Sequence, residues 1–168
     1  MKKENGFENI YNEYFKRVYA FLSKMCPDPF LCEEMTQETF YQAFKSFHRY
    51  DGSCEIFTWL AAVAKNTYFK YLRKNRIHTV DIDLVPDGDD GEFDPARVIQ
   101  KQMTGEAVKK AVSSLPQKYR DVVVLRIYAE LSFSDIGKSL DISENSAKVI
   151  FFRAKKMLKE ALKDEYQL

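Results

Sequence analysis

Cationic and aromatic side chains alternate around the segment from residue 65 to residue 76. Every charged residue in this segment is basic, and rings occur both within it and just before it. Cations can follow a phosphate backbone while aromatic rings stack on unpaired bases, at about 1–3 kcal/mol per base. The segment therefore indicates contact with single-stranded nucleic acid. The cations are Lys65, Lys70, Arg73, Lys74 and Arg76, and the rings are Phe57, Trp59, Tyr68, Phe69 and Tyr71. The alternative is that the rings belong to a core, as we expect for Tyr68 and Tyr71.

A second candidate binding segment runs from Ser132 to Met157. It has the pattern of a short helix, a tight turn and a second helix with a basic C-terminal part. Ser132 and Asp135 have capping-box spacing, Asp141 suits a left-handed turn position, and Ser143 is a good N-cap. Such a unit can lay its second helix in the major groove of DNA. The alternative is an amphipathic helical hairpin with a solvated basic face.

Gly137 is costly inside the first of these helices, by about 1 kcal/mol relative to alanine, so we expect a second helix to cross closely there. In the second helix, Ala147, Ile150 or Phe151, Ala154 and Leu158 form the expected buried stripe. The cations expected to project from it are Lys148, Arg153, Lys155, Lys156 and Lys159.

Residues for covalent chemistry are sparse. We find no nucleophile–base set and no phosphate loop, and the only histidines are His48 and His78. Cys26, Cys32 and Cys54 form no CxxC pair, so reduced thiols in a cytoplasm are favoured over a zinc site with His48 as fourth ligand. We therefore expect no enzyme activity, no cofactor, no metal and no small-molecule substrate.

The elements that position both segments are predicted to be helices. Apolar residues recur at helical spacing in residues 7–25, 32–47 and 56–76, and again after residue 105, without useful strand alternation. In the second of these helices the residues expected to face inward are Met35, Phe40, Ala43, Phe44 and Phe47, and in the later block one helix is expected from Tyr119 to Tyr128. No apolar run approaches the ~20 residues of a membrane span, and the N-terminus lacks a secretory signal core.

Charge divides the 168-residue chain into three blocks. Residues 1–76 carry 12 Lys and Arg against 9 Asp and Glu, residues 77–104 carry 2 against 7, and residues 105–168 carry 12 against 9. The net charge of +1 therefore hides two basic blocks around an acidic one. The fold class predicted is all-α, with small helical domains at 1–76 and 105–168 joined by a flexible acidic linker at 77–104.

Two stretches together resemble a known family. Residues 32–76 resemble region 2 of extracytoplasmic-function sigma factors, the group 4 members of the sigma-70 family. The matching features are Glu34 with Gln37-Glu38-Thr39-Phe40, Phe57-x-Trp59-Leu60, and Ala64-x-Asn66 with Arg73. Residues 113–158 resemble region 4 of the same family. The ordered pair, separated by a variable linker, covers most of the chain.

The resemblance implies a cytoplasmic RNA polymerase sigma factor. It would bind core RNA polymerase, direct it to promoter DNA and help melt the −10 element. The implied polymerase contacts are Glu34, Gln37, Glu38 and Phe40. The implied −10 contacts are Tyr50, Asp51, Gly52, Ser53, Phe57, Trp59, Lys65, Asn66, Lys70, Arg73, Lys74 and Arg76, with a flipped base captured at the loop 50–56. The implied −35 contacts are Ser143, Asn145, Ser146, Lys148, Arg153, Lys155 and Lys156.

The chain departs from the family at its second basic helix. Val149-Ile150 stand where members often have a Ser-Arg pair, so base readout falls to other residues or to DNA shape. The family also implies an anti-sigma factor as partner, often anchored in a membrane. Two alternatives remain: a helix-turn-helix regulator that acts without polymerase and uses residues 1–76 for a ligand or dimerisation, and a module that binds polymerase without starting transcription.

Overall fold

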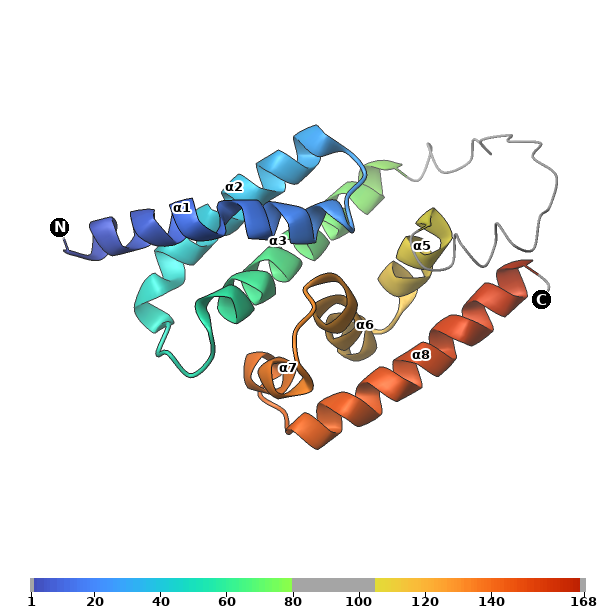
Figure 1. Ribbon diagram of the computed structural model, residues 1–168. Coiled ribbons are helices and arrows are strands. Elements are labelled where there is room, and N and C mark those ends of the chain that lie inside the picture. The colour runs from blue at the N-terminus through green and yellow to red at the C-terminus, as the bar shows by residue number, and fades with distance from the viewer. Residues whose placement is uncertain (1, 80–104, 167–168) are drawn as a thin grey trace.

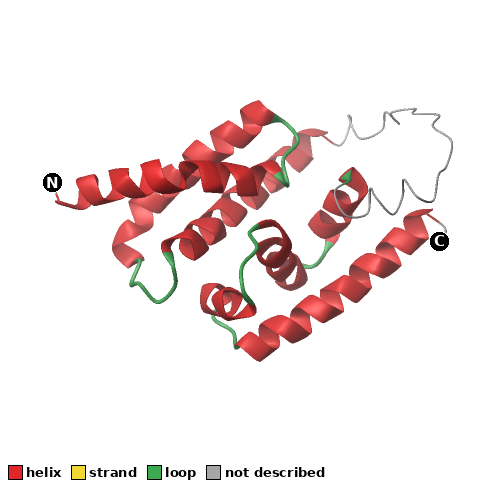
Figure 2. Cartoon of the chain, viewed as in Figure 1, coloured by secondary structure: helices red, strands yellow, loops and turns green. Residues whose placement is uncertain are grey.

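The computed structural model describes residues 2–79 and 105–166, and these ranges contain helices joined by short turns and no strand (Figures 1 and 2). The predicted all-α class is confirmed. The predicted linker at 77–104 lies outside the described residues, except that residues 77–79 continue the third helix.

The first domain is a bundle of α1 (Lys2–Ser23), α2 (Pro29–Ser46) and α3 (Ile56–Thr79), with a 3-10 turn at Phe47–Arg49. Asp28 fixes the start of α2 because its carboxylate accepts a hydrogen bond from the Phe30 N–H at 3.0 Å. Pro29 occupies the first helical turn, where its missing N–H has no intrahelical partner to lose.

Apolar residues at helical spacing meet in the centre of this bundle. Val18, Phe21 and Leu22 of α1 and Leu60 of α3 are almost fully buried. Phe40 of α2 joins the same core, with its ring 5.0 Å from that of Tyr11 and only 3% of the residue exposed. Burial of such side chains is the main stabilising term, at about 1.5–3 kcal/mol each.

The second domain contains α5 (Glu106–Ser114), α6 (Gln117–Val123), α7 (Phe133–Leu140) and α8 (Glu144–Tyr166). The single helix expected from Tyr119 to Tyr128 widens after α6 into a π-helical turn at Val124–Tyr128. The Ala129 N–H closes that turn on the Val124 carbonyl at 3.2 Å. Long α8 packs across α5, α6 and α7.

The two domains pack against each other. In Figure 1, α3 lies between the α1–α2 pair and the second domain, and its neighbours there include α7 and the π-helical turn. The buried residues of both domains form one contiguous hydrophobic cluster. The sequence indicated two tethered domains and gave no sign of this contact.

Candidate nucleic-acid interface

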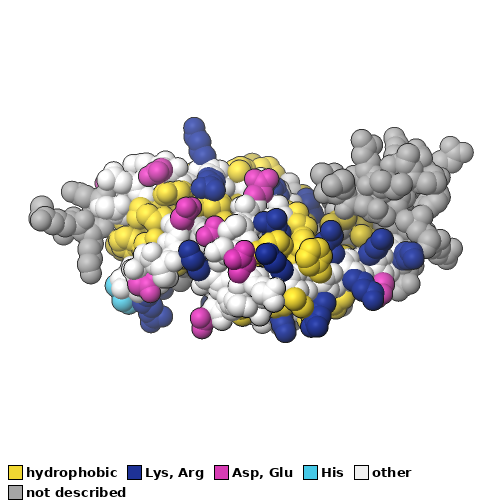
Figure 3. All heavy atoms as spheres, turned by 60° about the horizontal axis from the view of Figure 1, so that its bottom comes forward, with side chains coloured by type: hydrophobic (Ala, Val, Ile, Leu, Met, Phe, Trp, Pro, Cys, Tyr) yellow, Lys and Arg dark blue, Asp and Glu magenta, His cyan; other side chains and the backbone are white. Residues whose placement is uncertain are grey.

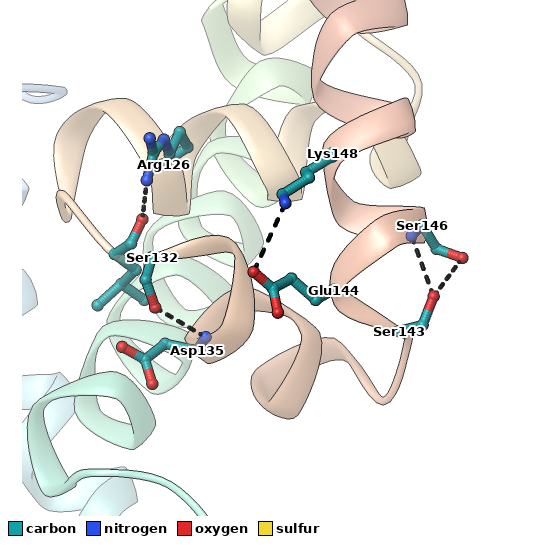
Figure 4. Close-up of polar contacts among 8 residues, drawn as sticks. Arg126, Ser132, Asp135, Ser143, Glu144, Ser146 and Lys148 are labelled. Atoms are coloured by element: carbon teal, nitrogen blue, oxygen red, sulfur yellow. Dashed lines mark hydrogen bonds and ion pairs between the residues drawn. The ribbon is translucent and has the colours of Figure 1, made fainter.

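Local hydrogen bonds build the turn between α7 and α8 (Figure 4). The Ser132 hydroxyl accepts from the Asp135 N–H at 3.1 Å, and the Ser143 hydroxyl accepts from the Ser146 N–H at 3.0 Å. Between these caps, Asp141 adopts the left-handed conformation with φ 57° and ψ 48°. The predicted helix-turn-helix is therefore present, with both caps and the left-handed turn residue as expected.

Gly137 is required by the turn rather than by a crossing helix. A Cβ atom at this position would lie 2.7 Å from the Ile142 carbonyl oxygen and 3.3 Å from the Glu144 nitrogen. Real Cβ atoms do not approach backbone that closely, so a side chain would push the turn open. The expectation of a closely crossing helix was wrong in this detail, because the close neighbour is the backbone leading into α8.

Arg126 connects the preceding segment to this unit. Its guanidinium donates to the Leu131 carbonyl at 3.0 Å (Figure 4). The same group lies 4.2 Å from the centre of the Phe133 ring. The chain entering α7 is thus fixed by a hydrogen bond and a cation–π contact.

One side of α8 is buried and the other is exposed. Ala147, Ile150, Ala154 and Leu158 form the buried stripe, so Ile150 and not Phe151 is its second member. The expected −35 residues are all exposed, either on that other side of α8 or at the cap before it, namely Ser143, Asn145, Ser146, Lys148, Arg153, Lys155 and Lys156. Figure 3 shows this basic surface with hydrophobic side chains among the lysines and arginines. The exposed Lys148–Glu144 pair, at 3.7 Å, adds little stability.

The loop before α3 is held by its own polar groups. The Tyr50 hydroxyl donates to the Cys54 carbonyl, and the Asp51 carboxylate accepts from the Ser53 N–H at 2.9 Å. Hydrogen bonds from Ser53 lower the pKa of Asp51. Gly52 has φ +79°, which glycine adopts without strain. The half-buried rings of Tyr50 and Trp59 lie 5.3 Å apart at this loop, tilted by 36° to each other.

A groove of about 370 Å³ lies between α2 and α3, which pack against each other. It brings together residues expected to contact DNA and residues of the helix expected to contact polymerase. Within it, the Gln42 side-chain amide donates to the Glu38 carboxylate at 2.7 Å. The lining residues are Met35, Glu38, Gln42, Val63, Asn66, Thr67, Lys70, Tyr71 and Lys74.

Two residues expected on the −10 surface are buried instead. Phe57 is 3% exposed, and the Arg17 guanidinium lies 3.6 Å from its ring centre. Lys65 is also 3% exposed, and its ammonium group lies 3.1 Å from the carboxylate of Asp121 in the second domain. Burial lowers the pKa of Lys65, and the Asp121 charge partly opposes this shift. In this arrangement neither side chain can reach a DNA strand.

The remaining −10 residues are more accessible. Asp51, Gly52, Ser53, Asn66, Lys70, Arg73 and Lys74 are exposed, and Tyr50 and Trp59 are half-buried. The side chain of Arg76 lies outside the described part of the chain.

The outer face of α2 differs from the one expected. Glu34 and Gln37 are exposed, Glu38 is half-buried in the groove, and Phe40 is a core residue because α1 covers it. A direct contact between Phe40 and a partner was therefore the wrong expectation for this packing. Phe44, expected to point inward, is 48% exposed.

Two further exposed rings on α2 were missed. Phe30 is 83% exposed and Tyr41 is 56% exposed, while soluble proteins usually bury such rings. Phe30, Glu34, Gln37, Tyr41 and Phe44 follow one another at steps of three or four residues, which places them along one side of α2. This spacing, counted from Gln37, was the feature of the sequence that could have predicted the exposed rings.

The described residues hold no group of three or more His, Cys, Asp or Glu side chains suited to a metal ion. Cys26, Cys32 and Cys54 are free thiols, and burial raises the pKa of Cys32 to about 11. Among the helices of the described ranges, none has the length and apolarity needed to cross a bilayer.

Comparison with known proteins accounts for both domains. The sequence matches the Sigma-70 region 2 family over residues 10–77 and the Sigma-70 region 4 family over residues 105–158. It is 33% identical over 154 residues to the ECF RNA polymerase sigma factor SigM of Bacillus subtilis strain 168, covering 90% of this chain and 92% of SigM. It is 25% identical over 174 residues to SigW of the same organism, covering 96% and 91%.

Solved structures share the fold. The sigma factor RpoE in complex with the anti-sigma factor NepR from Bartonella quintana has a TM-score of 0.58 at 19% identity, covering 94% of this chain and 97% of RpoE. CnrH in complex with the cytosolic domain of CnrY gives a TM-score of 0.58 at 15% identity, covering 96% and 90%.

Two helical domains in this order, one carrying a helix-turn-helix, define a sigma-70 family architecture. At the identity and coverage found with SigM, the chain belongs to the ECF RNA polymerase sigma factors. It is a transcription initiation factor that binds core RNA polymerase and directs it to promoters.

Proposed function

We propose that the chain divides this function among three surfaces. The outer side of α2 contacts core polymerase through Glu34 and Gln37. The loop at residues 50–53 and the exposed part of α3 contact the −10 element. The exposed side of α8 contacts the −35 element. The observation that carries the proposal is the capped helix-turn-helix, in which the Ser143 cap and the second helix together expose all seven expected −35 residues.

Electrostatics support the DNA assignments. Between residues 145 and 159, α8 carries five cations and no acid, and Asn66, Lys70, Arg73 and Lys74 project from α3. Phosphate contacts by such side chains provide affinity and register for both elements. Lys65 can join the −10 contacts only when the second domain moves away from α3, because Asp121 now holds it.

The assignment to α2 rests on exposure and family position together. Glu34 and Gln37 lie on a side that no other described helix covers, next to the exposed rings of Phe30 and Tyr41. Exposed rings beside polar groups are typical of protein interfaces. Phe40 contributes to this surface only indirectly, because its buried ring packs against α1 and holds α2 in place.

Membership of the sigma factor family also leads to three general expectations. The chain performs no covalent chemistry of its own, it works in the cytoplasm where core polymerase lies, and an anti-sigma factor binds it. The solved relatives RpoE and CnrH were each captured with a protein partner, NepR and CnrY, which supports the last point.

A reconstitution tests the proposal directly. The full chain is mixed with core RNA polymerase, separated by size, and assayed for transcription on a promoter library. We expect co-elution and promoter-specific transcripts. Co-elution without transcripts would favour a module that titrates polymerase, and duplex binding without co-elution would favour an independent regulator.

A charge change tests the α2 surface. Glu34→Lys with Gln37→Lys should weaken core binding by about fivefold or more, because loss of an interface anchor costs more than about 1 kcal/mol. Glu13→Lys changes an exposed glutamate on α1 and is the matched control. Equal core affinity for both variants, with unchanged circular dichroism, would remove the assignment.

A further inference from the structure

Two large apolar side chains are exposed on the DNA-facing helix. Val149 is 40% exposed and Phe152 is 62% exposed. They are three residues apart, so they lie on the same side of α8. That side is opposite to the buried stripe through Ile150 and Ala154. Neither side chain has a hydrogen-bonding group, so neither gains from contact with water.

The ring of Phe152 is held in place by a row of rings. It lies 6.0 Å from the Phe151 ring, which is half-buried and lies 5.5 Å from the Phe133 ring of α7. Both contacts are edge-to-face, the arrangement that aromatic pairs favour. Phe152 is therefore an oriented apolar group rather than a loose surface side chain.

The surroundings of this pair identify the occupant. Lys148, Arg153, Lys155 and Lys156 are exposed around it, and the nearest acid along α8, Glu144, is paired with Lys148 at 3.7 Å. A complementary surface must be anionic and must also offer small apolar groups. Duplex DNA meets both conditions, because thymine methyl groups are the apolar feature of its major groove.

The position of the pair along α8 fits the same groove. The helix begins at Glu144 after the Ser143 cap, and Val149 and Phe152 are its sixth and ninth residues. The first nine residues of a helix span about 12 Å, which is about the width of the major groove. Recognition helices contact base edges through their N-terminal part.

We propose that Val149 and Phe152 read thymine methyl groups in the −35 element. At the positions that these two residues reach, the helix then selects T·A pairs by apolar contact with the methyl group. It does not select them there by hydrogen bonds to the base edges, as a polar residue would. This inference rests on the proposed function, in which α8 enters the −35 duplex.

The test replaces thymine by deoxyuridine, which removes only the methyl group. Holoenzyme made with core polymerase first selects sequences from a duplex library randomised across the −35 region. Each thymine of a selected site is then changed to deoxyuridine, and affinity is measured. We expect a loss of about fourfold at one or more positions, the effect of burying one methyl group.

Variants of the protein show which side chain contacts each methyl group. Val149→Ser and Phe152→Ser should each abolish the thymine preference at one position and leave the others unchanged. Ile127→Ser, which changes an exposed apolar side chain of the π-helical turn, should leave every thymine preference intact. Since the thymine-to-deoxyuridine ratio is measured within one variant, partial misfolding cancels.

The outcomes separate this inference from the proposed function. Specific selection with equal affinity for thymine and deoxyuridine at all positions would overturn the inference alone. A thymine preference that both serine variants retain would also overturn the inference alone. In that case the exposed apolar pair would be assigned to contact with a protein partner instead. Failure to select any sequence, or to bind core polymerase, would overturn the proposed function and the inference with it.

Discussion

Removing the carboxylate of Asp121 should separate the two domains without unfolding either one. Asp121→Ala leaves the Lys65 ammonium group, which is 3.1 Å from that carboxylate, as an uncompensated charge in a side chain that is 3% exposed. Breaking a buried pair in this way costs about 3–5 kcal/mol. Lys65 escapes the cost when the second domain moves away, because its side chain then reaches water.

The free-energy change therefore appears in the equilibrium between packed and separated domains. A cost of about 3 kcal/mol shifts that equilibrium toward separation by about a hundredfold. The other interdomain contacts, such as the Arg120 guanidinium 4.1 Å from the Phe69 ring centre and the Lys24 ammonium 3.1 Å from the Tyr128 carbonyl, are left to hold the domains together.

Small-angle scattering measures the outcome as a rise in radius of gyration, and a single-stranded −10 oligonucleotide should bind more tightly because Lys65 is freed. Lys65→Met with Asp121→Leu should restore packing, since apolar side chains can replace a buried pair at little cost. Glu130→Ala, which removes an exposed carboxylate 3.9 Å from Lys24, should change neither quantity. An Asp121→Ala variant as compact as the wild type, with unchanged oligonucleotide affinity, would refute the reasoning.

Three further predictions concern the same elements. Burial lowers the pKa of Lys65, so the packed state binds fewer protons than the separated state between that lowered pKa and the ordinary value of about 10.4. Domain packing should therefore strengthen as pH rises through this window, seen as a falling radius of gyration, and Lys65→Met should remove that contribution. Gly137→Ala should destabilise the chain by about 1–3 kcal/mol in chemical denaturation, because its Cβ would meet the turn carbonyl at 2.7 Å, whereas Gly6→Ala, with nothing within 4 Å, should be neutral or stabilising. A stable Gly137→Ala variant would contradict the geometry. Neutralising Lys155 and Lys156 should flatten the salt dependence of DNA binding by up to about 0.9 log units per log salt for each lost phosphate contact, and an unchanged slope would show that they touch no phosphate.

The helix-turn-helix could be predicted from the sequence because local interactions form it. The caps at Ser132 and Ser143 and the left-handed Asp141 depend on side chains and backbone within a few residues of each other. The family motifs added the division of labour between the domains. Gly137 shows the limit of local reading, because its requirement for a small side chain was evident while the neighbour responsible was not.

Burial depended on contacts between distant segments. Phe40 and Tyr41 are adjacent rings on α2, yet one is 3% and the other 56% exposed, because α1 covers only one of them. Periodicity placed Phe44 inward, yet it is 48% exposed even though its ring lies 5.2 Å from that of Phe7 on α1. An amphipathic pattern marks a side of a helix but does not say how far a neighbouring helix extends over it.

The sequence by itself determined the helices, the capped turn, the charge blocks and the membership of the sigma factor family, since these rest on local spacing and short motifs. Only the tertiary structure decided which basic side chains of α3 are accessible to DNA. Lys65 and Lys70 are both lysines of that helix, but Lys65 meets Asp121, which lies 56 positions further along the chain, and Lys70 faces the groove beside α2. A contact across that separation exists only once two independently patterned domains have packed, so no local pattern records it.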